Sequence, residues 1–180
     1  MAERPLVDLS NLSTQLGKFL GMPSELPPVD QWQPKLSGDI DMVIKADGTW
    51  LHEGGEIKRS KLVRLFSTIL RREENEYFLV TPVEKWRLQV EDQPFTVVLI
   101  EAKNHDDKTV IRMITNTGDE FPLDSHHVLK QDQHEAPKVH VRANMYARLN
   151  RNAFYTLAGM ATEREGQFYV TSNGIEFNIG

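Results

Sequence analysis

Residues 50–64 read WLHEGGEIKRSKLVR, and this stretch predicts how a strand passes into the main helix of the first half. Trp50–Glu53 alternates like the end of a strand, and Gly54 and Gly55 predict a loop. Ser60 is the expected N-cap, because its hydroxyl can accept a free backbone N–H at the helix start. Arg71–Arg72 is expected to close the helix, where cations are favoured. The predicted buried stripe is Leu62, Leu65, Phe66 and Ile69.

The start of this helix has an unusual charge, because basic residues gather where the helix macrodipole is already positive. These residues are Lys58, Arg59, Lys61 and Arg64. A glycine-rich turn that leads into a helix is a common phosphate or carboxylate site, so we expect an anion here, with Arg59 as a bidentate donor. The alternative is surface ion pairing with Glu53 and Glu56, worth about 0–1 kcal/mol. Neither GxxxxGK[ST] nor GxGxxG is present.

Trp50 and His52 are two residues apart and therefore share one face of the expected strand. If that face lines a cleft, Trp50 can stack on a base and His52 can exchange a hydrogen bond with a ligand. The structural alternative is a core tryptophan and a histidine that caps a loop, and the core is favoured for Trp50.

The last part of the chain repeats the pattern of the first. FLVT at 78–81 matches FYVT at 168–171, and in both halves a strand, a basic segment, a helix, an acidic turn and a hairpin follow one another. Asn150 or Asn152 is the expected cap of the second helix. Asn173–Gly174 predicts a type I′ hairpin turn. Basic residues again precede or open the helix, namely Arg142, Arg148 and Arg151.

This repeat predicts an α+β fold of two related halves, each with antiparallel strands and one main helix. We expect a short N-terminal helix within residues 1–24, at about 9–20, capped by Ser10 or Asp8 and stopped by Gly21 and Pro23. The halves are expected at 25–93 and 94–180. If they pack around a pseudo-twofold axis, their two basic helix starts converge on one cleft.

Composition excludes several classes of protein. A net charge of −5 argues against general DNA or RNA binding. The longest apolar run, Val97–Ile100, is too short to cross a membrane. The N-terminus has no secretion signal, and the chain has no cysteine, so disulfides, thiolate nucleophiles and zinc–thiolate sites are out. The default location is the cytoplasm.

No catalytic constellation can be identified. No GxSxG elbow and no HExxH motif is present. The fragments His105–Asp107 and Asp124–His127 could bind a metal, but both lie in expected turns, where Asp and His are ordinary. We predict no metal site, and the sequence favours a binding module over an enzyme.

The chain resembles the bacterial family named domain of unknown function 1285. The resemblance is carried by WLHEGGEIKRSKLVRLFSTILRR and the following YFLVTPVEK, with PPVDQWQP and GDIDM upstream and YARLNRNAFY downstream, and it spans roughly residues 25–180. It implies a duplicated α+β core, a C-terminal half superficially like a pleckstrin-homology domain, and a nucleotide-based ligand between the halves with a signalling role. The positions that match are Trp50, His52, Glu53, Gly54, Arg59, Arg64, Arg142, Arg148 and Arg151.

The sequence-based hypothesis is therefore a cytoplasmic module that holds a small anionic, nucleotide-like ligand at the interface of two related halves. The cofactor and oligomeric state are left unknown, and no nucleic acid or membrane partner is expected. The alternative is a protein–protein interaction module without a small ligand, in which the edges of Phe95–Ala102 or Lys85–Val90 add a partner strand.

Overall fold

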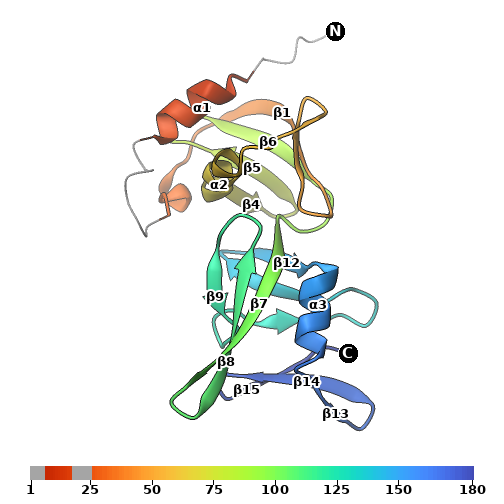
Figure 1. Ribbon diagram of the computed structural model, residues 1–180. Helices are drawn as coiled ribbons and strands as arrows, with labels where there is room; N and C mark the ends of the chain where they lie inside the picture. Colours follow the sequence, from red (N-terminus) through yellow and green to blue (C-terminus); the bar gives the residue numbers. More distant parts are fainter. Residues whose placement is uncertain (1–6, 18–25) are drawn as a thin grey trace. The chain divides into compact units, whose positions relative to one another are not determined.

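The computed structural model describes residues 7–17 and 26–180, and the chain divides into two compact units, Met1–Glu91 and Asp92–Gly180 (Figure 1). Each unit is described by itself. Within residues 7–17 and 26–180, no helix is long and apolar enough to cross a bilayer.

The first unit is built on one six-stranded sheet with the order β3-β2-β1-β6-β5-β4. Two antiparallel three-stranded meanders meet where β1 pairs with β6 in parallel. The first and last of these strands along the chain, β1 and β6, are thus neighbours in the sheet. The strands are β1 (Leu36–Ile44), β2 (Trp50–His52), β3 (Gly55–Glu56), β4 (Leu70–Glu73), β5 (Glu76–Val80) and β6 (Lys85–Val90).

The helices of the first unit are α1 (Leu9–Leu16), a 3-10 turn (Val29–Gln31) and α2 (Ser60–Thr68). Asp8 caps α1 by accepting a hydrogen bond from the backbone N–H of Ser10, so the cap is Asp8 rather than Ser10. The predicted end of α1 at Gly21 and Pro23 lies outside the described residues.

Two predictions about α2 are wrong. Ser60 is the first helical residue and Arg59 occupies the N-cap position without a side-chain hydrogen bond to the backbone. The helix ends at Thr68, and Arg71 and Arg72 lie in β4, where they pair with Phe78 and Tyr77. The strand is favoured over a longer helix because Leu70 and Leu79 bury fully on facing positions of the ladder.

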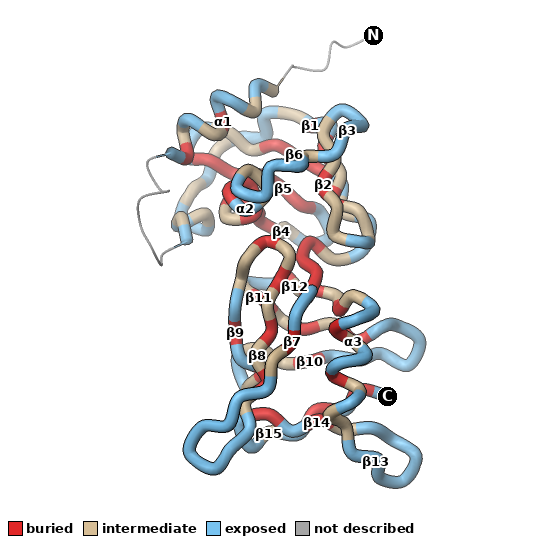
Figure 2. The backbone as a smooth tube through the Cα atoms, in the orientation of Figure 1, coloured by how far each residue is buried: buried red, intermediate tan, exposed pale blue. Residues whose placement is uncertain are grey.

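The core of the first unit lies between this sheet and α2. Figure 2 shows buried backbone along β5 and on α2. Trp50, Ile44, Phe66 and Leu79 are at most 2% exposed. Trp50 pairs with Ile44 across β2 and β1, so the face on which Trp50 lies is the inner face of the sheet.

The second unit has a six-stranded sheet with the order β10-β11-β12-β7-β8-β9 and a separate three-stranded sheet, β13-β14-β15. Here β12 pairs with β7 in parallel, and all other ladders are antiparallel. The elements are β7 (Phe95–His105), β8 (Lys108–Thr115), β9 (Glu120–Pro122), β10 (Leu129–Lys130), β11 (Lys138–Arg142), β12 (Met145–Leu149), α3 (Arg151–Ala158), β13 (Thr162–Arg164), β14 (Gln167–Ser172) and β15 (Ile175–Asn178).

The two six-stranded sheets have the same plan, so the α+β prediction with two related halves is confirmed. In both, a meander of three strands joins a second meander through a central parallel pair. In the second sheet, β7 is the parallel neighbour of β12, as β6 is of β1 in the first sheet. The second unit contains one more three-stranded meander than the first, because β13–β15 form a separate sheet. α3 and β13–β15 follow β12 as α2 and β4–β6 follow β3.

Local signals in the second half act as expected. Asn150 caps α3 by accepting from the backbone N–H of Ala153. Asn173 and Gly174 both take positive φ, 52° and 77°, between β14 and β15. These two features fix the helix start and the hairpin register.

The two edges expected to accept a partner strand differ. β6 lies between β1 and β5 and has no free edge, so the prediction for Lys85–Val90 is wrong. β7 pairs with β8 along most of its length, but β12 covers it only at Phe95–Val97. The part of β7 beyond Val97 has no second neighbouring strand among the described residues.

Candidate functional site

The first candidate site is a group of basic side chains around the start of α2, here called the α2 cluster. All four side chains are exposed, and none makes a hydrogen bond or ion pair with any described residue. The backbone N–H groups of Ser60 and Lys61 also find no acceptor within the described ranges. The α2 cluster consists of Lys58, Arg59, Lys61 and Arg64.

A tight hairpin delivers the chain to this helix start. Glu53 and Gly54 form a two-residue turn between β2 and β3, with φ of 50° and 76°. Both angles lie in the left-handed region, as a type I′ turn requires, which suits glycine at the second position. The predicted two-glycine loop is therefore wrong in detail, because Gly55 already belongs to β3. Ile57 then donates from its backbone N–H to the carbonyl of Trp50, 2.9 Å away, and anchors the last residues before α2.

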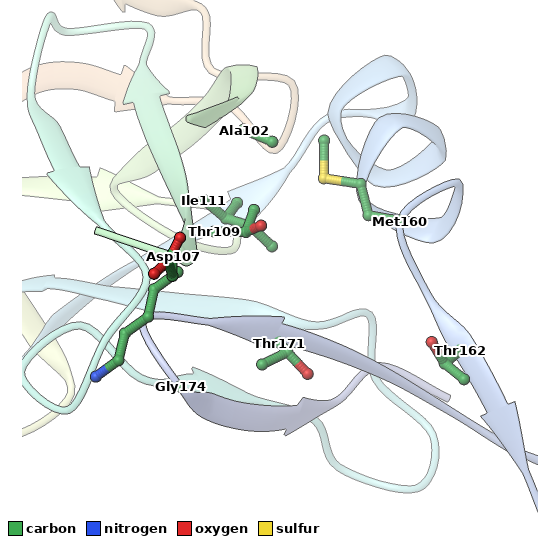
Figure 3. Close-up of a pocket in the computed structure, with 9 residues that line it drawn as sticks. Ala102, Asp107, Thr109, Ile111, Met160, Thr162, Thr171 and Gly174 are labelled. Carbon is green, nitrogen blue, oxygen red and sulfur yellow. The ribbon is translucent and has the colours of Figure 1, made fainter. Parts of the chain in front are cut away.

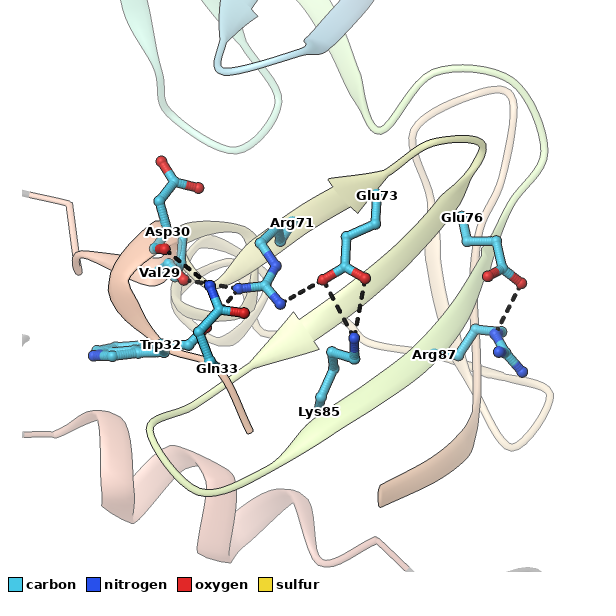
Figure 4. Close-up of polar contacts among 9 residues, drawn as sticks. All are labelled: Val29, Asp30, Trp32, Gln33, Arg71, Glu73, Glu76, Lys85 and Arg87. Carbon is cyan, nitrogen blue, oxygen red and sulfur yellow. Dashed lines mark hydrogen bonds and ion pairs between the residues drawn. The ribbon is translucent and has the colours of Figure 1, made fainter. Parts of the chain in front are cut away.

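The predicted pairing of this cluster with Glu53 and Glu56 does not occur, because neither glutamate makes an ion pair with a described residue. Several other cations of the same unit have polar partners, as Figure 4 shows for Arg71, Lys85 and Arg87. Arg71 donates to the carbonyls of Val29 and Trp32, at 3.0 and 2.7 Å, and pairs with Glu73.

The rest of that polar network holds the sheet together. Lys85 lies 3.0 Å from Glu73, and Arg87 lies 3.0 Å from Glu76 and 2.9 Å from Asp39. Burial alone would raise the pKa of Glu73, but hydrogen bonds from Lys85 and Arg71 and their positive charges together hold it below its usual value. These cations are structural, whereas the four side chains of the α2 cluster have no acidic partner among the described residues.

The other predicted site residues of the first unit have different environments. Trp50 is 2% exposed and its ring belongs to the core, so the structural alternative is the one observed. His52 is half-buried on β2, and its ring makes no hydrogen bond with a described residue. Glu53 is exposed at the hairpin turn. Glu53 is therefore open to solvent and His52 is partly so, whereas the ring of Trp50 is closed off from solvent.

Arg142 is not a free cation. The register between β11 and β12 shifts after His140, so Arg142 pairs with Met145 and shares its inward face. The guanidinium lies over the ring of Phe95 and pairs with Asp119. Burial lowers the pKa of Arg142, and the neighbouring Asp119 carboxylate opposes that effect. Arg142 therefore closes one end of the hydrophobic core of the second unit.

Arg148 and Arg151 lie apart from Arg142. Arg148 points to the solvent side of β12 and pairs with Asp92 at 3.0 Å. Arg151 is exposed in the first turn of α3, with its guanidinium carbon 5.6 Å from the ring centre of Tyr155, one turn further on. The structure thus brings the four basic residues of the first unit together but distributes the three arginines of the second unit over three environments.

A second group of cations was missed by sequence reasoning. Lys130, Lys138 and Arg148 are direct neighbours across β10, β11 and β12, because Lys130 pairs with Lys138 and Lys138 pairs with Arg148. We call them the cationic row. The signal was the alternation of basic and apolar residues in Lys138–Arg142 and Met145–Leu149, but β12 was not predicted as a strand.

The second unit also contains a groove of about 390 Å³ (Figure 3). It lies between the β7–β8 hairpin, the segment after α3 and β14, and none of the predicted site residues lines it. Its walls combine apolar side chains of Ala102, Ile111 and Met160 with hydroxyls of Thr109, Thr162 and Thr171.

The Asp124–His127 fragment has a structural role. Asp124 accepts backbone hydrogen bonds from His126 and His127, at 2.8 and 2.9 Å, and so forms a turn. In the described part of the chain, no group of three or more His, Asp and Glu side chains is placed to hold a metal ion.

Comparison with known proteins places the chain in a family. The model "Domain of unknown function (DUF1285), N-terminal domain" matches residues 27–93, and "Protein of unknown function (DUF1285), C-terminal domain" matches residues 94–179. A search of curated proteins finds no match.

Two solved structures are similar. One, described as a DUF1285 family protein from Silicibacter pomeroyi DSS-3, is 38% identical, with a TM-score of 0.77 over 92% of this chain and 93% of that chain. The other, a DUF1285 family protein from Shewanella baltica OS155, is 28% identical, with a TM-score of 0.56 over 67% of this chain and 91% of that chain. The chain belongs to the DUF1285 family.

Proposed function

We propose that this protein is a binding module for a small anionic, nucleotide-like ligand and that it has a regulatory or signalling role in the bacterial cytoplasm. The observation that carries the proposal is the α2 cluster: four exposed cations around a helix start, without an acidic partner among the described residues. That the two halves share one ligand stays a prediction.

The physical argument is one of unbalanced charge. Like charges at the positive end of a helix cost a few tenths of a kcal/mol each when exposed. The sequence accumulates them although Glu53 and Glu56 are near in the chain and leave them unpaired. An anion at this point gains from the side chains, from the free N–H groups of Ser60 and Lys61 and from the helix dipole together.

The ligand is recognised through its negative groups rather than by stacking on Trp50, because that ring is buried. Arg59 precedes the first helical residue, and its guanidinium can form two parallel hydrogen bonds to a phosphate or carboxylate. His52 and Glu53 supply polar groups on the hairpin that leads to α2.

The test is a thermal-shift series with mono-, di- and triphosphate nucleotides, since a ligand selective for the folded state raises the melting temperature by mass action. We expect a rise for the wild type and its loss in Arg59→Ala and Lys61→Ala. Lys35→Ala is the matched control, because Lys35 is an exposed lysine of the same unit without an ion pair among the described residues. The proposal is overturned if no nucleotide raises the melting temperature, or if Lys35→Ala weakens binding as much as Lys61→Ala.

A second candidate function is the capture of a protein strand at β7. Val98 and Leu99 are 40% and 47% exposed, and they lie where β7 loses its β12 neighbour. An extended segment could continue the sheet there. A stoichiometric partner that binds wild type and Arg59→Ala but not Leu99→Lys would favour this function over the small-ligand site.

A further inference from the structure

The cationic row on β10–β12 places three positive charges side by side on the solvent face of one sheet. Lys130 and Lys138 are directly opposite each other, as are Lys138 and Arg148. Neighbouring strands are about 4.8 Å apart, so the row runs over about 10 Å. Like charges directly opposite one another destabilise a sheet, so the arrangement needs a compensating negative charge.

Tyr146 completes this face. It pairs with His140 one step along the same ladder and therefore projects from the same side as Lys138 and Arg148. Lys130 donates to the hydroxyl oxygen of Tyr146 at 2.8 Å, which leaves the hydroxyl proton of Tyr146 free to be donated to a ligand. Lys130 and Lys138 lie 5.0 and 6.0 Å from the centre of its ring, so the ring gathers the ammonium groups.

The chain supplies the compensating charge from exposed carboxylates, and Arg148 pairs with Asp92 at 3.0 Å. Lys138 lies 3.4 Å from Glu135 and 4.0 Å from Asp132, and both carboxylates belong to the loop between β10 and β11. The side chains of Glu135 and Asp132 are 64% and 72% exposed. Such exposed and long ion pairs are worth little, so the two carboxylates can leave at small cost.

We propose that the cationic row binds a soluble oligophosphate group, and that Asp132 and Glu135 occupy its place as displaceable internal counter-charges. A chain of phosphates carries several negative charges in line, so it can contact more than one cation of the row. Arg148 pairs with the exposed Asp92 in this structure and can turn its planar fork to one phosphate, while the two lysines provide point charges for the next.

A membrane surface fits this face less well than a soluble ligand. Large apolar side chains that are exposed in the described ranges include Val98, Leu99, Tyr155 and Phe168, and none of them lies on β10, β11 or β12. The face therefore offers charge without an apolar group to enter a bilayer. The site lies wholly in the second unit and does not rest on the α2 cluster.

The experiment titrates inorganic triphosphate into the full chain by calorimetry at low salt. We expect Lys138→Gln and Arg148→Gln each to weaken binding about tenfold or more, since each removes a charge-assisted hydrogen bond. Lys103→Gln, an exposed lysine on β7, is the control with the same loss of charge and is expected to change affinity little. Equal weakening by Lys103→Gln and Lys138→Gln would overturn the proposal, as would the absence of triphosphate binding.

The internal counter-charges give a prediction of opposite sign. Asp132→Asn with Glu135→Gln is expected to strengthen triphosphate binding several-fold, because competing carboxylates are removed. Glu163→Gln with Glu165→Gln removes the same charge from exposed positions on the β13–β14 hairpin and serves as control. If both pairs strengthen binding equally, the loop has no role as a competitor and the proposal is wrong.

Two further arms separate the possible outcomes. Binding to phosphatidylcholine vesicles that contain phosphatidylinositol bisphosphate, without binding of free triphosphate, would overturn the choice of a soluble ligand. Arg59→Ala is expected to leave the effects of the Lys138 and Arg148 variants unchanged. Failure of the α2 cluster to bind nucleotides and failure of the cationic row to bind triphosphate are thus seen in different variants.

Discussion

The guanidinium of Arg142 lies over the ring of Phe95, with its central carbon 4.6 Å from the ring centre. Phe95 is fully buried at the start of β7, and Arg142 ends β11, so one cation–π contact spans the sheet at the closed end of the second core. Asp119, from the turn before β9, pairs with the same guanidinium and also accepts from Thr117 at 2.7 Å.

Arg142→Met is expected to lower the free energy of unfolding by about 3 kcal/mol or more, because it leaves Asp119 as a part-buried charge without its partner. Urea unfolding of the variant measures the loss. Arg148→Met is the matched control, since Arg148 is on the solvent side and its pair with Asp92 is worth about 1 kcal/mol at most. Equal losses in the two variants would contradict the buried role of Arg142.

Glu73 is expected to make the first unit sensitive to acid. Its folded-state pKa is below the usual value, so its ion pairs stabilise the protein above the usual carboxyl range and are lost as pH falls through the folded pKa. Unfolding measured from neutral to acidic pH should show a smaller acid loss in Glu73→Gln. Glu74→Gln, exposed at the next turn, should leave the wild-type acid loss unchanged; an equal change in both variants would argue against the Arg71–Glu73–Lys85 network.

Gly54 and Gly55 offer a paired test of the hairpin before α2. Gly54 has a φ of 76°, so Gly54→Ala is expected to cost about 1 kcal/mol of stability through backbone strain. In Gly55→Ala the new Cβ would lie 3.6 Å from the carbonyl oxygen of His52, an ordinary contact. The melting temperature of Gly54→Ala should therefore be clearly lower than that of Gly55→Ala. The reverse order would contradict the observed turn.

Asn150 is expected to matter more than its neighbour at the start of α3. Asn150→Ala removes the hydrogen bond from the backbone N–H of Ala153, 2.8 Å long, and should cost about 1 kcal/mol. Asn152→Ala changes an exposed side chain inside the helix and should be close to neutral. Chemical denaturation of the two variants measures their free energies of unfolding. A larger loss of stability in Asn152→Ala would indicate that Asn152, rather than Asn150, is the N-cap.

Local chemistry made much of the fold predictable. The caps at Asp8 and Asn150, the turn at Asn173–Gly174 and the apolar stripe of α2 depend on residues a few positions apart, and the structure contains each of them. The repeat of strand, helix and hairpin was also readable, because each half repeats the same local signals.

The rest depends on partners distant in the chain. Arg71 and Arg72 have good helix propensity, and their place in β4 follows from the ladder with β5. The inward turn of Arg142 depends on a one-residue shift in the β11–β12 register, which no alternation pattern reveals. The four basic residues at α2 were found because they are adjacent in sequence, whereas the cationic row was missed because it is assembled across three strands.

The parallel joining of β1 with β6, and of β12 with β7, has a consequence for synthesis on the ribosome. Asp39 of β1 pairs with Arg87 of β6, which is 48 residues later in the chain. One edge of nascent β1 therefore has no partner strand until β6 has emerged. The second half waits similarly, with β7 made first and β12 much later. The first sheet can therefore close only after nearly all of its unit has left the exit tunnel, whereas the second can close once β12 has emerged, before α3 and β13–β15 are complete. The earlier half is free to finish while the later one is still being translated.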